Sequence, residues 1–147
     1  MNIGIMPHTR KPAAVELSRE IIEYFSDKDV WLWLEQGTAN LIGYPALGRP
    51  KEELRRLDVL LVLGGDGALL NAARLISALD VALLGINMGH LGFLTELERD
   101  DVFVALDKLL LRQYSVEERM FIDSVVLRSG KEVAFYRALN DVVIARG

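Results

Sequence analysis

The sequence predicts an α/β fold in which a Rossmann-like parallel sheet with flanking helices precedes the first strands of an all-β domain. Two short runs, 58–63 and 81–86, are almost wholly apolar, which is typical of strands buried on both faces of a parallel sheet. The second of these runs fits a central strand. The segment 11–25 repeats apolar residues at helical spacing, and strands that alternate with helices are typical of βαβ units.

Local patterns predict the remaining elements. In the helix expected over 11–25, the residues Ala14, Leu17, Ile21 and Phe25 share one face. The stretch GTANLIGYPALGRP has neither the helical nor the strand period, and its glycines and prolines predict a mobile or substrate-facing loop. Other expected strands are 2–6 and 30–34, and other expected helices are 50–57, 68–79 and 100–111.

The pattern changes from position 114 onward. The segments 116–128 and 132–144 look like strands joined by the turn RSGKE, with no helical period between them. We therefore expect two domains, an α/β nucleotide-binding domain over 1–113 and the first strands of a β-rich domain over 114–147.

The amino-acid composition limits the classes of protein to which this chain can belong. The chain has 147 residues, 51% of them hydrophobic, and a mean hydropathy of +0.22, which favours a packed core over disorder. Its net charge of −4 comes from interspersed charges, so we expect neither nucleic acid nor a membrane surface as a partner. The absence of cysteine and of a secretory signal pattern predicts a cytoplasmic protein without disulfides.

The most informative motif is GGDG, at the end of the apolar run 58–63. Ligands of open α/β sheets lie outside the carboxyl ends of the strands, and glycines there let a substrate approach the backbone. Asp66 is the only functional side chain in this turn, and the next helix aims its first N–H groups at the same crevice, where a phosphate would fit. The alternative is that Asp66 caps the helix. A cap needs no glycines, and this motif has three, so we favour a functional acid.

The second motif is NMGHLGFLTE, 87–96, again directly after a predicted strand. Its glycines permit close backbone approach, and Phe93 offers a flat apolar surface to a purine, although a Phe packed in the core is an equal alternative. His90 is better explained as a loop residue than as a ligand, because no second ligating side chain stands at metal-binding spacing.

The third motif is Asn140-Asp141, at the start of an otherwise apolar strand. Polar side chains there need partners, and an Asn with a carboxylate is a combination that holds a ribose diol. Taken locally, a strand-entry turn made by the same pair is the favoured alternative.

GGDG, the NMGHLGF segment and the NDVVI segment, in this order, closely resemble the bacterial NAD kinase family, which carries GGDG, NxGxLGF and N-[ED]-V-V-I. The opening NIGIMPHTRKP, the segment YSVEERM and the β-rich tail also look like that family. The resemblance implies ATP-dependent phosphorylation of NAD to NADP at the 2′-hydroxyl of the adenosine ribose. It also implies a homo-oligomer and a β-rich second domain that binds NAD.

The resemblance also implies residue roles. Asp66 would contact the 2′-hydroxyl as general base or orienting group, and Gly67 would contact the same nucleotide through its backbone. Phe93 would lie against the adenine, and Asn140 and Asp141 would bind the ribose. Mg²⁺ would enter with the ATP phosphates, and no residue of the chain is assigned to a metal site of its own.

The chain departs from the family pattern at two positions and in length. Ala68 stands where many members carry Thr or Asn, and Asp141 stands where many carry Glu. Family members are nearly twice as long, so we expect a truncated chain that lacks most of the second domain and is inactive alone. The alternatives are a lipid or sugar kinase of the same superfamily, which the second and third motifs disfavour, and a non-catalytic nucleotide-binding module.

Overall fold

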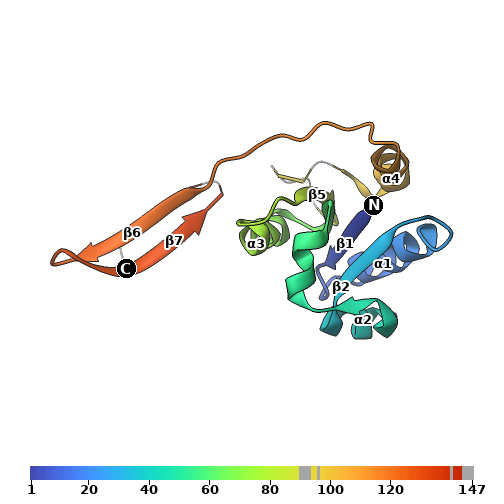
Figure 1. The fold of residues 1–147 in the computed structure, drawn as a ribbon, viewed down its shortest axis with the longest axis horizontal. Coiled ribbons are helices and arrows are strands. Elements are labelled where there is room, and N and C mark those ends of the chain that lie inside the picture. Colours follow the sequence, from blue (N-terminus) through green and yellow to red (C-terminus); the bar gives the residue numbers. More distant parts are fainter. Residues whose placement is uncertain (90–93, 96, 140, 144–147) are drawn as a thin grey trace. The chain divides into compact units, whose positions relative to one another are not determined.

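The computed structural model describes residues 1–89, 94–95, 97–139 and 141–143, which form two compact units, Met1–Ser115 and Val116–Gly147. The first unit carries a five-stranded parallel sheet of order β3-β2-β1-β4-β5 (Figure 1). Its strands are β1 (Asn2–Pro7), β2 (Trp31–Glu35), β3 (Gly48–Arg49), β4 (Val59–Gly64) and β5 (Ala82–Asn87).

Helices cover both faces of this sheet (Figure 1). Along β4, Leu61 and Leu63 belong to one apolar cluster and Leu60 and Val62 to the other, because neighbouring side chains in a strand point to opposite faces. The first cluster includes residues of α1 (Pro12–Tyr24), α2 (Gln36–Ile42) and α4 (Val102–Leu110), and the second includes residues of α3 (Asp66–Ile76) and of the 3-10 helix η2 (Lys51–Arg56). Two shorter 3-10 helices are η1 (Pro45–Leu47) and η3 (Arg99–Asp101).

Helix α1 forms where the helical period predicted it. Pro12 stands in the first turn, where its missing N–H is not needed by the helix. Its predicted apolar face is buried, together with Ser18, whose hydroxyl donates a hydrogen bond to the carbonyl oxygen of Ala14 at 2.7 Å. At the other end of the helix the Tyr24 hydroxyl donates to Asp107 of α4. Burial, reinforced by this bond, raises the pKa of Tyr24 to about 12.

The loop predicted over 37–50 is wrong, because this stretch forms α2, η1 and β3. Ala39 and Ile42 of α2 are buried in the cluster that α1 covers, so tertiary packing orders a helix too short to be stable alone. The helix ends at Gly43, whose φ of 89° is in the left-handed region. The glycines and prolines of this stretch mark the ends of short elements.

The interpretation of 81–86 as a central strand is also wrong. β5 is parallel, but it is the last strand in the described sheet, and its first three residues are only half-buried. Its outer side is paired at one point, where Asn87 N–H donates to Leu97 O at 2.7 Å and Leu97 N–H donates to Gly85 O at 3.2 Å. A wholly apolar run shows that both faces of a strand are covered, and it carries no information about the strand's edges.

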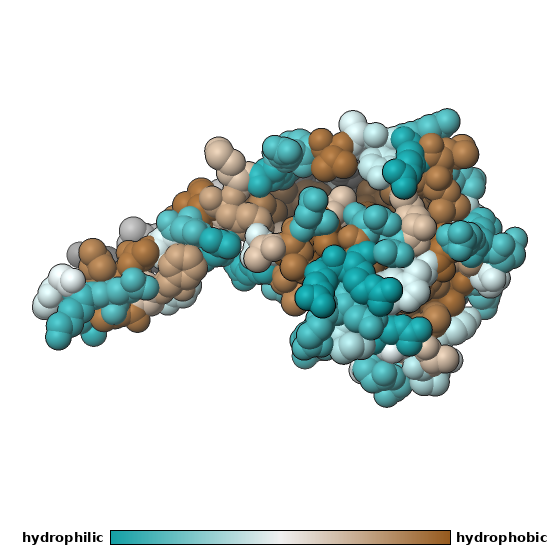
Figure 2. All heavy atoms as spheres, in the orientation of Figure 1, coloured by the Kyte–Doolittle hydropathy of each residue, from teal (hydrophilic) through white to brown (hydrophobic). Residues whose placement is uncertain are grey.

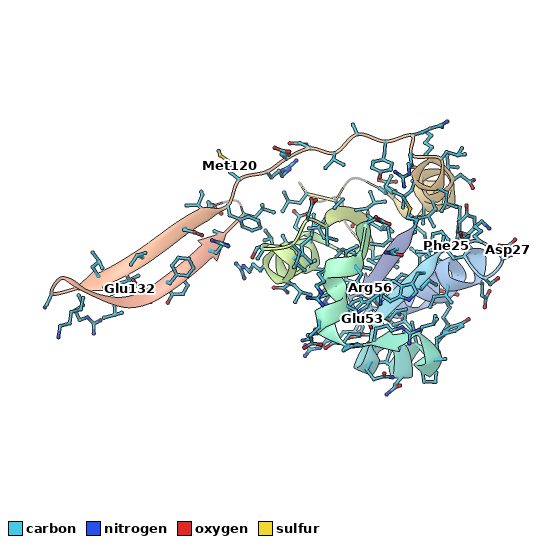
Figure 3. All side chains as sticks on the ribbon, in the orientation of Figure 1. Phe25, Asp27, Glu53, Arg56, Met120 and Glu132 are labelled. Atoms are coloured by element: carbon cyan, nitrogen blue, oxygen red, sulfur yellow. The ribbon has the colours of Figure 1, made fainter. Side chains whose placement is uncertain are left out.

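The predicted helix over 50–57 is the 3-10 helix η2, whose Glu53 and Arg56 lie close together, with 3.7 Å between the carboxylate and a guanidinium nitrogen (Figure 3). The guanidinium carbon of Arg56 lies 4.8 Å from the centre of the Trp31 ring. The helix predicted over 100–111 is divided between η3 and α4.

The second unit contains an antiparallel hairpin, β6 (Ile122–Arg128) and β7 (Lys131–Ala138). Ser129 and Gly130 both have positive φ, 52° and 76°, as a two-residue hairpin turn of type I′ requires. Both predicted strands were too long, because pairing ends at Ile122 opposite Ala138 and residues beyond that pair have no partner strand among those described. Apolar side chains of the hairpin are exposed, and Figure 2 shows some of them interspersed with hydrophilic ones.

None of the described helices combines the length and the apolar character that crossing a bilayer requires.

The packing of α4 generates a stability prediction. Leu106 is fully buried between α4 and the sheet, so Leu106→Ala leaves a cavity and is expected to lower the free energy of unfolding by about 2–5 kcal/mol. Val104 lies on the same helix but is 58% exposed, so Val104→Ala should change the free energy of unfolding by less than about 0.5 kcal/mol. Urea unfolding monitored by circular dichroism measures both, and equal effects would show that α4 is not packed in this way.

Candidate functional site

The strand order places a topological switch point at the carboxyl ends of β1 and β4. From β1 the chain winds outward to β2 and β3, and it then returns to the other side of β1 to form β4 and β5. The connections therefore leave β1 and β4 in opposite directions, and in open α/β sheets this reversal is where ligands bind. GGDG begins at Gly64, the last residue of β4, and so lies at this switch point.

The first glycine of GGDG is required by packing. A Cβ added to Gly64 would lie 2.5 Å from the Cβ of Ala68, which is too close for the first turn of α3 to stay where it is. Gly65 and Gly67 differ, because a Cβ at either position would meet no atom of the described residues within 4 Å. The backbone on both sides of Asp66 therefore faces open space, as a site that admits a ligand requires.

Asp66 is the first residue of α3, and the N-cap position belongs to Gly65, whose backbone is extended. The helix thus begins two residues earlier than predicted. The carboxylate is half-buried, and its Oδ1 accepts a hydrogen bond from Leu94 N–H at 3.1 Å. Leu94 belongs to the second sequence motif, so this bond joins the first motif to the second.

Backbone hydrogen bonds hold the start of the second motif against the first. Met88 N–H donates to Gly64 O at 2.9 Å, and the buried Asn87 accepts a bond from Gly89 N–H at 3.1 Å through its side-chain oxygen. Asn87 therefore shapes the turn after β5. These bonds bring the connections that follow β4 and β5 to one edge of the sheet.

The structure describes some of the predicted site residues and not others. Asp66 and Gly67 lie at the switch point beside the second motif. Phe93 and Asn140, and also His90, lie outside the described residues. Asp141 is exposed and belongs to no helix or strand of the second unit, so the strand expected to begin with the Asn140-Asp141 pair is wrong at this position.

Sequence reasoning missed Lys11, on the connection between β1 and α1. Its Nζ donates to Met88 O at 3.3 Å, and a Cβ on Gly89 would lie 3.1 Å from that nitrogen. His8 N–H of the same connection donates to Leu63 O at 2.8 Å. The rule that drew attention to GGDG could have found this segment, because PHTRKP also follows the carboxyl end of a parallel strand.

Within the described residues no group of three or more His, Cys, Asp or Glu side chains is arranged to hold a metal ion. The described residues bring to this edge of the sheet the Asp66 carboxylate, the Lys11 ammonium, open backbone and the N-terminus of α3. Such a set can orient a hydroxyl and bind an anion.

Comparison with known proteins identifies relatives of the chain. The sequence model of one protein family, described as the ATP-NAD kinase N-terminal domain, matches residues 3–114 of this chain. The NAD kinase of Moorella thermoacetica is 42% identical over 145 residues, which are 99% of this chain and 46% of that protein. The NAD kinase of Natranaerobius thermophilus is 38% identical over 147 residues, 99% of this chain and 51% of that protein. The chain thus spans about half the length of these relatives.

A solved structure confirms the predicted fold class. Yeast NADH kinase, complexed with NADH, has a similar fold with a TM-score of 0.81, over 95% of this chain and 47% of that chain. Its sequence is only 19% identical to this one, so the likeness concerns the fold.

The glycines of GGDG generate a second stability prediction. Gly64→Ala forces its new methyl against Ala68 and should lower the free energy of unfolding by about 1–3 kcal/mol. Gly65→Ala is the matched control, since its extended backbone and open surroundings accept a methyl, and should cost less than about 0.5 kcal/mol. Denaturant unfolding compares the two, and a Gly64→Ala protein as stable as the control would contradict the packing described here.

Proposed function

Because the chain belongs to the ATP-NAD kinase family, we propose that it forms the first half of an enzyme that transfers the γ-phosphoryl group of ATP to NAD. The acceptor is the 2′-hydroxyl of the adenosine ribose, and the products are ADP and NADP. The observation that carries the proposal is the position of Asp66, at the switch point of the sheet between two glycines that face open space.

In this proposal Asp66 orients the acceptor hydroxyl and accepts its proton. Phosphoryl transfer passes through a loose transition state, so little proton removal is needed early and a weak base is sufficient. Orientation matters more, because holding a nucleophile in line with the phosphorus can contribute on the order of 7–11 kcal/mol. The bond from Leu94 N–H supports such a role, since it holds the carboxylate in one orientation.

The helix and the glycines complete the proposed phosphate site. The N-terminus of α3 carries a partial positive charge, and Gly67 lies in its first turn with open space beside its backbone. ATP would bring Mg²⁺ bound to its phosphates, and the ion would supply neutralisation of charge on the transferred group.

The remaining assignments rest on the family resemblance. We propose that Phe93 lies against the adenine of NAD and that Asn140 and Asp141 bind its ribose. The α/β domain over 1–113 would bind the nucleotides, the β-rich segment over 114–147 would begin the part that completes the NAD site, and the enzyme would act in the cytoplasm as a homo-oligomer.

Substrate choice tests the function. The full-length gene product that carries this chain should form NADP from ATP and NAD, and should phosphorylate neither diacylglycerol nor fructose 6-phosphate. NADP is measured with an NADP-specific dehydrogenase, and ADP release is measured for every acceptor. Phosphorylation of the lipid or the sugar without NADP formation would reject the proposal, and so would nucleotide binding without any turnover.

Asp66→Asn tests the acid. The amide keeps an oxygen that can accept the Leu94 N–H but loses the charge and the basicity, so kcat should fall about 100-fold or more while the unfolding midpoint stays close to wild type. Asp80→Asn, on the exposed turn after α3, is the control and should keep normal kcat. Normal turnover by the Asp66→Asn enzyme would remove Asp66 from the mechanism.

A further inference from the structure

Hydrogen bonds hold both the backbone and the side chain of Lys11, and the side chain extends across the candidate site. Its backbone N–H donates to His8 O at 2.8 Å, and its own carbonyl oxygen accepts from Ala14 N–H at 3.0 Å, at the start of α1. Its side chain reaches Met88 O, which follows β5. Since β4 lies between β1 and β5 in the sheet, a side chain that starts after β1 and ends beside Met88 passes over the carboxyl end of β4. GGDG is located there.

The ammonium group of Lys11 has no carboxylate partner among the residues that the structure describes. Among the described residues its ammonium makes one hydrogen bond, to a neutral carbonyl oxygen, although an ammonium group has three donors. Arg99 of η3 shows the contrast, because its guanidinium lies 2.7 Å from an oxygen of Glu20 and 3.8 Å from an oxygen of Glu16, both on α1. A half-buried cation without a counter-ion favours an anionic ligand.

The surroundings of Lys11 also favour an anion. The N-termini of α1 and α3 both face this edge of the sheet, because each helix follows the carboxyl end of its strand, and each adds a partial positive charge. Gly89 has no side chain and so keeps the space beside the ammonium open, since a Cβ at this position would lie 3.1 Å from Nζ. A larger residue would displace the side chain or occupy the space next to it.

We infer that Lys11 binds the phosphate chain of a nucleotide substrate and holds it beside Asp66. This inference rests on the proposed function, since it assigns Lys11 to the same site. The triphosphate of ATP and the pyrophosphate of NAD offer the same chemistry to an ammonium group, which binds phosphate as a point charge. The aliphatic stem lets the charge follow the phosphate, and the Met88 carbonyl holds the group in place between ligands.

The test is the thermal unfolding of the full-length gene product, with inorganic tripolyphosphate, ATP or NAD added in turn. A ligand that binds the folded protein raises the unfolding midpoint in proportion to its occupancy. Lys11→Met keeps the aliphatic stem and removes the charge, and Lys11→Arg keeps the charge. Lys108→Met is the matched control, because Lys108 is exposed in the last turn of α4, next to the residue that bonds Tyr24 at the far end of α1.

Without ligand, Lys11→Met should unfold close to the wild-type midpoint. Its dissociation constant for tripolyphosphate should rise about 10-fold to 100-fold, as the loss of a charged hydrogen bond predicts, whereas Lys11→Arg and Lys108→Met should stay within about threefold of wild type. If Lys11→Met raises the dissociation constant of ATP by a similar factor and leaves that of NAD unchanged, the contact is to the donor triphosphate. If only the dissociation constant of NAD rises, the contact is to the pyrophosphate of the acceptor.

Wild-type protein that tripolyphosphate does not stabilise would overturn the inference, and so would Lys11→Met protein that binds all three ligands as wild type does. A large fall of the ligand-free midpoint in Lys11→Met, with unchanged ligand shifts, would show that Lys11 only supports the loop after β5. Failure of the proposed function has a different signature. In that case the protein binds tripolyphosphate through Lys11 but forms no NADP.

Discussion

The parallel pairing of β1 with β4 is the constraint on which the rest of the structure depends. It runs from Ile3 opposite Val59 to Pro7 opposite Leu63, with both strands buried, and it brings together two chain segments that are more than fifty residues apart. Because the winding of the sheet reverses between these strands, their connections diverge at a topological switch point. The turn with Asp66 and the connection with Lys11 both lie at this switch point because of that pairing.

Close packing then fixes the start of α3 at this switch point. Gly64 has no side chain, so the first turn of α3 can pack against the end of β4 through Ala68, and Asp66 becomes the first residue of the helix. The side chain is held from the other side by Leu94 N–H. The methyl of Ala68 is the atom that lies against Gly64.

The two units differ in what stabilises them. The first has apolar clusters on both faces of its sheet, whereas the hairpin of the second is held by its ladder, its turn and a bidentate pair in which Arg137 donates to Asp123 at 2.6 and 2.7 Å. An isolated hairpin is at best marginally stable in water, and several apolar side chains of this one are exposed. The chain spans about half the length of the relatives to which it is similar.

The sequence by itself determined the order and type of the main elements, because burial leaves periodic traces in residues such as Ala14, Leu17 and Ile21. It also placed Asp66 at the end of a buried strand, since glycines beside an acid are a local signal. Only the tertiary structure decided that 37–50 is ordered, because Ala39 and Ile42 owe their burial to α1, and that β5 is the last described strand, because strand order depends on pairing between distant segments. The position of Lys11 was decided in the same way. Its contact with Met88 spans 77 residues of sequence, and no local pattern records which strand lies between them.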